Sequence, residues 1–192
     1  MKTEKAVLRA LVILLMFLAL ACSTSKITPE KAHVIFEGAV DLYTGTCGCE
    51  DRMAAKELLL KASGAGSAHA RMWIANLIRL GDCGFEKDVK KAKRMAKEAI
   101  DEIRFPAYSG DPESAYLMGT AYCRSLGVPK NYDKGLEWLV KAAEAGHAES
   151  MNLLACAHEH GWYGLKKDFE RSFEWRLKAA EAGHAYAMEY VA

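Results

Sequence analysis

The sequence lacks an excess of charge of either sign, any catalytic signature motif and any apolar run of full membrane-spanning length. The chain has 26 Lys and Arg residues against 25 Asp and Glu residues, a formal net charge of +1. No basic block or stripe is present that would attract nucleic acid. The G-x-S-x-G, phosphate-loop and H-E-x-x-H motifs are absent as well. These absences favour a binding protein over an enzyme.

The first 21 residues have the layout of a secretory signal. Lys2, Lys5 and Arg9 precede an apolar run over residues 11–20, which small residues follow. The run is about half of the roughly 20 apolar residues that a membrane-spanning helix needs. We therefore expect residues 1–21 to be a removable signal peptide.

The end of this segment, Ala19-Leu20-Ala21-Cys22, resembles the bacterial lipobox. The resemblance implies that Cys22 is lipidated, that residues 22–28 form a tether, and that Ser23 sorts the protein to the outer membrane, facing the periplasm. The match departs from the usual pattern, which has Leu at the position of Ala19. The same residues also fit an ordinary A-x-A cleavage site. A soluble periplasmic or secreted protein is therefore the alternative.

An internal repeat is the strongest signal in the sequence. The segment Lys141–Ala148, KAAEAGHA, recurs 37 residues later as Lys178–Ala185, and a weaker copy begins at Lys61. A second marker, a glycine followed by an apolar residue and then Lys-Asp or Lys-Asn, falls in the middle of each period. Two turn signals per period, separated by apolar helical stretches, predict helix–turn–helix units. The marker glycines are Gly66, Gly110, Gly146 and Gly183 at the repeat ends, and Gly84, Gly127 and Gly164 in the middle.

This pattern resembles the Sel-1-like repeat family, a relative of the tetratricopeptide repeat. The resemblance implies an all-α fold, a right-handed α-solenoid of about four repeats and a terminal half-repeat within residues 29–192. Trp138 and Trp175 hold equivalent positions, and Met95 and Leu58 correspond to them upstream. All four are expected to pack inward. The expected repeats are 29–66, 67–110, 111–146 and 147–183, with the half-repeat at 184–192.

Start and stop signals place the helices. Thr28-Pro29-Glu30 and Asp111-Pro112-Glu113 each offer a capping side chain, a proline at the first helical position and an acid that favours the helix dipole. The second repeat is longer than the others, which is expected to lengthen its second helix and the following turn. No strand pattern is present. The predicted helices are 29–43, 51–63, 67–80, 87–104, 112–123, 131–145, 147–159, 168–181 and 184–191.

A stack of such repeats curves and has an extended concave face, because each unit contacts only its neighbours. This face is suited to binding a peptide or protein partner, and the candidate contact residues are Tyr116, Glu149 and Asn152. No cofactor or metal ion is implied. Two alternatives remain: a small-ligand binder or hydrolase of the kind associated with β-lactams in cysteine-rich members of the family, and a secreted factor that binds a host protein.

Five cysteines remain in the chain besides Cys22. Thiols of exported proteins tend to pair, and two bridges are expected. One joins Cys83 to Cys47 or Cys49, which lie at nearby positions of the preceding repeat. The other joins Cys123 and Cys156 on consecutive first helices. One thiol must remain unpaired within the chain, because five is an odd number.

Three sets of polar residues are expected to be structural or solvent-exposed. His158 and His160 are alternate residues of a helix and point apart, so they do not suit one metal ion. The histidines at the repeated positions, His147 and His184, are consensus residues of the repeat. The Lys90–Arg94 segment is expected to be the solvated side of a helix, with a docking patch for anionic lipid or an acidic partner as the alternative.

Overall fold

The structure, a computed structural model, describes residues 27–45 and 51–191. These residues form nine α-helices and one 3₁₀ turn, and none of them lies in a strand. The predicted all-α fold is confirmed. The predicted signal 1–21, Cys22, Cys47 and Cys49 lie outside the described residues. The elements are α2 (Pro29–Thr44), α3 (Arg52–Gly64), α4 (Ala68–Leu80), α5 (Val89–Tyr108), α6 (Pro112–Arg124), α7 (Tyr132–Glu144), α8 (Ala148–His160), η1 (Trp162–Gly164), α9 (Phe169–Glu181) and α10 (Ala185–Val191).

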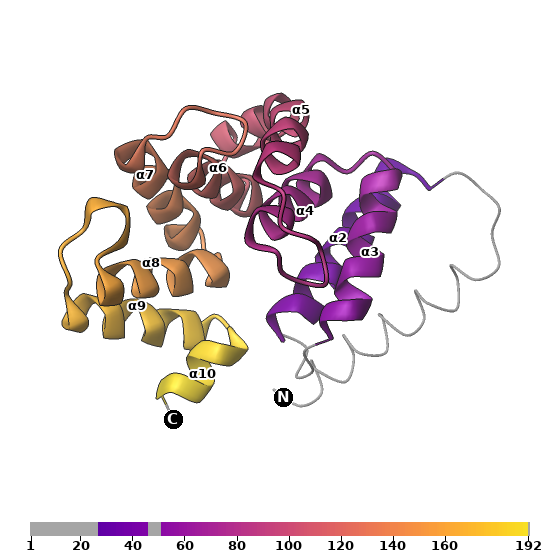
Figure 1. Ribbon diagram of the computed structural model, residues 1–192. Coiled ribbons are helices and arrows are strands. Elements are labelled where there is room, and N and C mark those ends of the chain that lie inside the picture. The colour runs from indigo at the N-terminus through magenta and orange to yellow at the C-terminus, as the bar shows by residue number, and fades with distance from the viewer. Residues whose placement is uncertain (1–26, 46–50, 192) are drawn as a thin grey trace.

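Successive helices pack as hairpins, and the hairpins stack in chain order. The most extensive contacts join α2 to α3, α4 to α5, α6 to α7, and α8 to α9. Contacts of α3 with α4, α5 with α6, and α7 with α8 link the hairpins, and α10 packs on α9 as a half-repeat. Figure 1 shows the hairpins arranged in an arc, whose two ends are the α2–α3 hairpin and the α8–α10 segment. This is the α-helical repeat array that the sequence predicts.

Polar side chains fix where the helices begin. Thr28, Ser67 and Asp111 cap the first helices of three hairpins by accepting a hydrogen bond from the backbone N–H three residues later. Each such cap contributes about 1 kcal/mol. The second helices are capped by Asp51, Asp88, Asn131 and Asp168. The mid-repeat marker of the sequence is therefore the turn and cap between the two helices of a hairpin.

The glycines at the repeat ends have a conformational role. Their φ angles lie between 90° and 95°, in the left-handed region that costs a residue with a Cβ roughly 1–2 kcal/mol. Each follows the last turn of a second helix and precedes the cap of the next first helix. The four are Gly66, Gly110, Gly146 and Gly183.

Helix α5 is longer than predicted, because it continues through Pro106 to Tyr108 instead of ending at 104. A proline lacks the N–H that would bond the preceding turn. Its carbonyl still takes part in the last turn, since it accepts hydrogen bonds from the backbone N–H groups of Ser109 and Asp111. The buried Ile103 and Ala107 hold the same turn against the core.

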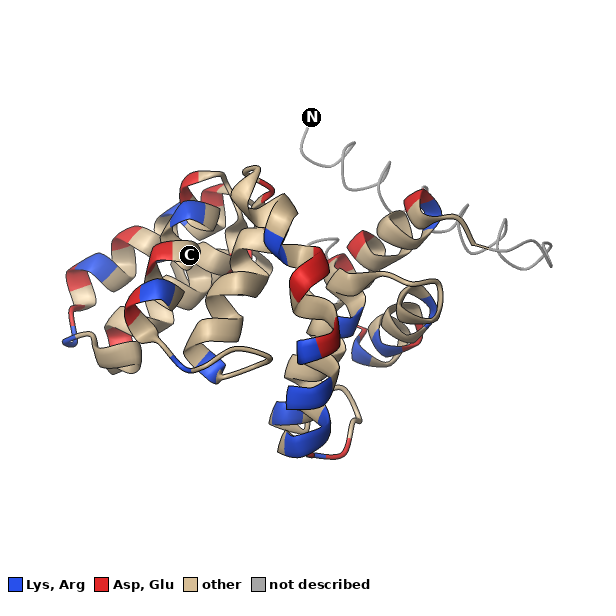
Figure 2. Ribbon diagram, turned by 90° about the horizontal axis from the view of Figure 1, so that it is seen from above, with Lys and Arg blue, Asp and Glu red and all other residues tan. Residues whose placement is uncertain are grey.

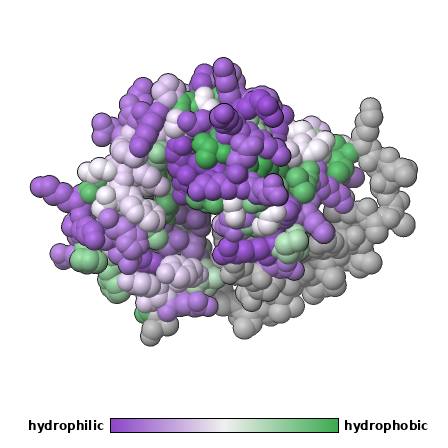
Figure 3. All heavy atoms as spheres, viewed as in Figure 1, coloured by the Kyte–Doolittle hydropathy of each residue, from purple (hydrophilic) through white to green (hydrophobic). Residues whose placement is uncertain are grey.

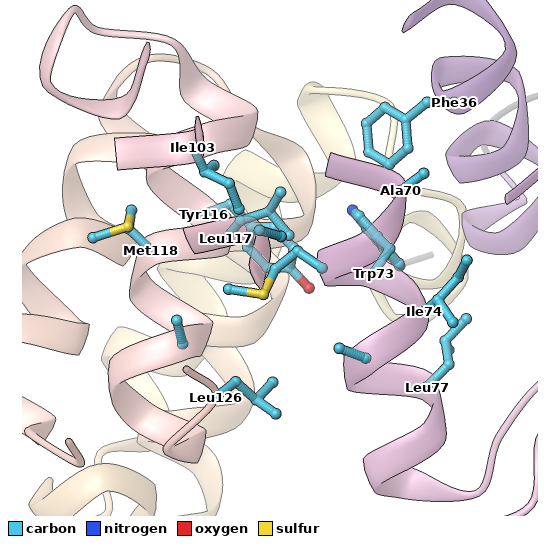
Figure 4. Close-up of a cluster of buried hydrophobic side chains, with 14 of the residues drawn as sticks. Phe36, Ala70, Trp73, Ile74, Leu77, Ile103, Tyr116, Leu117, Met118 and Leu126 are labelled. Atoms are coloured by element: carbon cyan, nitrogen blue, oxygen red, sulfur yellow. The ribbon is translucent and has the colours of Figure 1, made fainter. Parts of the chain in front are cut away.

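The core is a continuous layer between the helices. Figure 4 shows part of it, where Phe36 of α2, Trp73 of α4 and Leu117 of α6 pack with their neighbours. Trp138 and Leu58 are buried, and Met95 and Trp175 pack against the core from partly exposed positions. The four predicted inward residues therefore do contact the core.

Small residues set the closest helix approach. A Cβ added at Gly135 of α7 would collide with the Cys123 Sγ of α6 and lie 3.1 Å from the Gly119 carbonyl oxygen. The α6–α7 pair can therefore cross more tightly than larger residues would allow.

The outer face of α5 carries a concentration of positive charge. Figure 2 shows Lys and Arg gathered along the first half of this helix. The side chains are exposed, as the sequence predicts for a solvated helix side. They are Lys90, Lys91, Lys93, Arg94 and Lys97.

Candidate partner-binding surface

The inner side of the arc contains a cavity of about 610 Å³. The space-filling view in Figure 3 shows this side hollowed between the two ends of the array. Residues of three repeats line the cavity, and they come from α2, from the start of α6 and from the turn between α7 and α8. They are His33, Phe36, Glu37, Val40 and Asp41, then Asp111, Pro112 and Glu113, then Ala145, Gly146 and His147.

Acidic groups dominate the polar lining of the cavity. Glu37 and Asp41 lie on α2, and Asp111 and Glu113 lie at the start of α6. Burial alone would raise the pKa of Asp111. Hydrogen bonds from Ser114 and the nearby His69 lower it by more, so the net pKa is below its ordinary value. This carboxylate therefore stays charged at neutral pH. The cavity thus combines an apolar wall with a field that favours cations.

A row of contacting aromatic rings connects the repeats beside this cavity. The Tyr43 and Trp73 ring centroids are 5.4 Å apart, those of Trp73 and Tyr116 5.9 Å, and those of Tyr116 and His147 4.8 Å. Contacts of this kind contribute about 0.5–1.5 kcal/mol each beyond burial. Each ring belongs to a different repeat, so the row joins the four repeats along their first helices.

Tyr116, a predicted partner contact, is a packing residue in the structure. Its side chain is 4% exposed and lies between Trp73 and His147. Burial raises the pKa of its hydroxyl well above the ordinary value. Tyr116 lies on a first helix between two neighbouring repeats, and those repeats cover its side chain.

The other two predicted contact residues have different surroundings. Glu149 is engaged with the next repeat, because its Oε2 lies 2.8 Å from His184 Nε2. Asn152 is half-buried, and its Oδ1 is buried without a hydrogen-bond partner among the described residues. None of the three predicted residues lines the cavity.

The two repeated histidines form equivalent bridges between repeats. His147, the N-cap of α8, has Nε2 2.8 Å from Glu113 Oε2, and the other oxygen of Glu113 accepts a hydrogen bond from Trp73 Nε1 at 2.7 Å. His184 and Glu149 repeat this arrangement one unit later. The recurrence of histidine in the sequence was the visible signal of these bridges. The glutamate partner sits two residues after the preceding N-cap.

The C-terminal cysteines are free thiols in the structure, so the predicted Cys123–Cys156 bridge is not formed. Each thiol is directed at the second helix of its own repeat: Cys123 lies against Gly135 of α7, and Cys156 lies beside Arg176 of α9. Burial raises the pKa of Cys123 to about 11 and also raises that of Cys156. Cys83 is buried, with its Sγ 3.0 Å from the Arg52 carbonyl oxygen. Its predicted partners lie outside the described residues.

The histidines at the end of α8 are separated. His158 is buried, whereas His160 is exposed and its ring lies 5.0 Å from that of Trp162. Within residues 27–45 and 51–191, no group of three or more His, Cys, Asp or Glu residues is placed to hold a metal ion. No helix in this part of the chain is long and apolar enough to cross a membrane.

Stacked helical hairpins with periodic caps, inter-repeat bridges and a hollow inner face define a helical repeat protein of the α-solenoid type. The family described as Sel1 repeat matches residues 112–147 and 148–184, which are the third and fourth hairpins. The chain therefore contains two Sel1 repeats, in residues 112–184. No curated protein matches it.

Several solved structures resemble the chain at low identity. A Sel1 repeat protein from Oxalobacter formigenes is 23% identical, with a TM-score of 0.47, over 90% of this chain and 66% of that one. A protective antigen of uropathogenic Escherichia coli strains that displays an SLR fold is 23% identical, with a TM-score of 0.42, over 83% and 32%. An immunity protein from Pseudomonas aeruginosa is 16% identical, with a TM-score of 0.39, over 86% and 74%. The chain thus spans less than two thirds of the length of the first two.

Proposed function

We propose that this protein is a binding scaffold that holds a segment of a partner protein in the hollow of its repeat array. Sel1 repeat proteins generally mediate protein–protein interactions and are typically not enzymes. The observation that carries the proposal is the 610 Å³ cavity, which side chains from three repeats line together. A site assembled from several repeats suits an extended segment better than a small substrate.

The charge of the cavity indicates which part of a partner would enter it. Glu37 is 61% exposed, and the His33 beside it is 52% exposed, so both are accessible to a ligand. The partly exposed Val40 supplies apolar surface on the same helix. A Lys or Arg side chain matches both features, since its aliphatic stem can pack on apolar surface while its charge meets carboxylates.

The proposed location is the bacterial envelope. The signal-like residues 1–21 and the lipobox-like segment ending at Cys22 support export and anchoring at the outer membrane. In this arrangement a short tether holds the array at the membrane, and the partner is another envelope protein.

The test is crosslinking in cells followed by capture from envelope fractions, with wild type, Cys22→Ala and Glu37→Lys compared. We expect the wild type to recover a discrete envelope protein, Cys22→Ala to recover less, and Glu37→Lys to recover none. Glu57→Lys is the matched control, because it makes the same charge change at an exposed position of α3 away from the cavity. Equal capture by Glu37→Lys and Glu57→Lys would show that the cavity does not bind the partner.

The enzymatic alternative has a direct assay. Purified mature protein would be incubated with a chromogenic cephalosporin. Turnover that disappears on substitution of a single hydroxyl residue would favour a hydrolase over a scaffold.

A further inference from the structure

Two arginines lie close together at the edge of the first helices opposite to the cavity. Arg79 is in the last turn of α4, and Arg124 is the last residue of α6. Burial lowers the pKa of Arg79, and the positive charge of Arg124 lowers it further. Arg124 Nη1 lies 2.7 Å from Asn76 Oδ1, and Asn76 is one helical turn before Arg79 on α4, so the two arginines are neighbours, and both side chains are half-buried.

Neither guanidinium has a carboxylate partner among the described residues. Arg124 Nη1 donates to Asn76 Oδ1 at 2.7 Å, and the buried Nε of Arg79 has no hydrogen-bond partner within the described part of the chain. Apart from the exposed Arg94, the remaining arginines of the described residues all form ion pairs. These pairs are Arg52–Asp82, Arg71–Glu102, Arg104–Asp101, Arg171–Asp168 and Arg176–Glu159.

The architecture of the repeat explains only part of this arrangement. A cation in the last turn of a helix is favourable, because it faces the negative end of the helix dipole. That effect accounts for each arginine separately, but not for two of them sharing one half-buried region. They also occupy different positions of their helices, and α8 ends in His160 where α6 ends in Arg124. The pair is therefore particular to this site and is not a general feature of the repeat.

The surroundings of the pair favour a ligand with one negative charge. The Tyr163 hydroxyl is near enough to hydrogen-bond Arg124. The negative charge of Glu149 also stabilises the charged form of Arg124. With two cations and one nearby carboxylate, the excess charge is about +1, which matches a carboxylate better than a phosphate dianion. Guanidinium groups bind carboxylates through paired N–H donors, and Asn76, 9% exposed, holds one of these groups in place.

We propose that Arg79 and Arg124 bind a carboxylate of the partner segment, either its chain terminus or an acidic side chain. This inference rests on the proposed scaffold function and adds the direction in which the partner segment would bind. The α6 helix runs from the acidic cavity at Pro112 to Arg124. Its 13 residues span about 20 Å, a distance that about six extended residues cover. The bound segment therefore places a basic side chain in the cavity and a carboxylate roughly six residues away.

The test uses arginine Nε–Hε NMR signals of the folded protein, titrated with N-acetylglycine as the carboxylate probe. We expect saturable shifts for Arg79 and Arg124, none with the neutral N-acetylglycinamide, and at least about tenfold weaker binding in Arg79→Gln. Arg104→Gln, on the exposed side of α5, is the matched control and should bind as wild type does. Shifts that do not saturate, or that the amide also causes, would overturn the proposal. Tighter saturable binding of inorganic phosphate would overturn the choice of a carboxylate.

Two further readouts separate this proposal from a loss of fold and from the scaffold function. Because Arg79 makes no hydrogen bond through its buried Nε and is repelled by Arg124, Arg79→Gln should unfold at the same temperature as wild type or higher. A large decrease would instead assign Arg79 a structural role and contradict the proposal. If Glu37→Lys loses the partner in the cellular capture while Arg79→Gln retains it fully, the scaffold function stands and the carboxylate site falls.

Discussion

The two ends of the array share one helical architecture but join their repeats differently. Between α6, α8 and α10, an N-cap histidine meets the glutamate that lies two residues after the preceding N-cap. Between α4 and α6 the same two positions hold His69 and Asp111, 3.6 Å apart, with the acid now at the cap. Between α2 and α4 the cap is the uncharged Ser67.

This difference coincides with the limits of the family match. The Sel1 repeat matches cover 112–147 and 148–184, where the histidine bridges recur. The hairpins of residues 29–110 lie outside these matches, yet they pack in the same way. Helix pairing in this chain therefore depends on caps, turn glycines and small buried residues. The ionic bridges add a further contact between repeats. In this contact the acidic and the basic residue can swap positions, or the contact can be absent.

Removal of the central bridge should have the largest effect. Glu113→Ala leaves both Trp73 Nε1 and His147 Nε2 without their acceptor in a site where the Glu113 side chain is 17% exposed. We expect a loss of about 2–4 kcal/mol in the free energy of unfolding, measured by urea denaturation. Glu137→Ala is the control, because it removes only an exposed pair with Lys141 and should cost under about 0.5 kcal/mol. Equal losses in the two variants would contradict a structural bridge.

The thiols give a second contrast between the two ends. The N-terminal cysteines are predicted to be bridged, whereas Cys123 and Cys156 are free and buried or half-buried. With its pKa raised to about 11, Cys123 should be alkylated by iodoacetamide at least about 100-fold more slowly in the folded protein than in guanidinium. Peptide mass spectrometry would measure both rates. A Cys123 that resists alkylation in guanidinium until it is reduced would show that it is bridged after all.

The His69–Asp111 pair between α4 and α6, in which the acid and the histidine have swapped positions, can be tested by restoring the order of the later repeats. His69→Glu places a second carboxylate beside Asp111 and should destabilise the protein by about 1 kcal/mol. Adding Asp111→His recreates the arrangement of the later repeats and should recover most of that loss, since histidine already caps α8. Urea denaturation of the two single variants and the double variant gives the coupling energy. A coupling near zero would mean that the two positions do not interact.

Local features of the fold could be predicted from the sequence, whereas the surface could not. Caps such as Asp111 and Asn131 and glycines such as Gly146 act over a few residues, so the predicted helix ends lie close to the observed ones. The coverage of Tyr116 depends on how neighbouring repeats cross. The cavity depends on curvature, because it brings His33 and Glu37 next to Ala145, more than 100 positions later in the chain.

The smallest expected effect concerns a single position at which the third and fourth repeats differ. The fourth repeat has His158 where the third has Tyr122. Burial lowers the pKa of His158 below its ordinary value of 6.5, and the charge of Arg171 acts in the same direction. The unfolded chain therefore takes up a proton at His158 at a higher pH than the folded chain does.

Stability at this site is consequently full above about pH 6.5 and decreases as the pH falls through the lowered pKa of the folded state. His158→Tyr, which copies the third repeat, should flatten the decline in unfolding free energy between pH 7 and pH 5. The exposed His160→Ala is the control and should leave that decline unchanged. If His158→Tyr and wild type lose stability in parallel, the buried imidazole is not what makes the C-terminal repeats sensitive to acid.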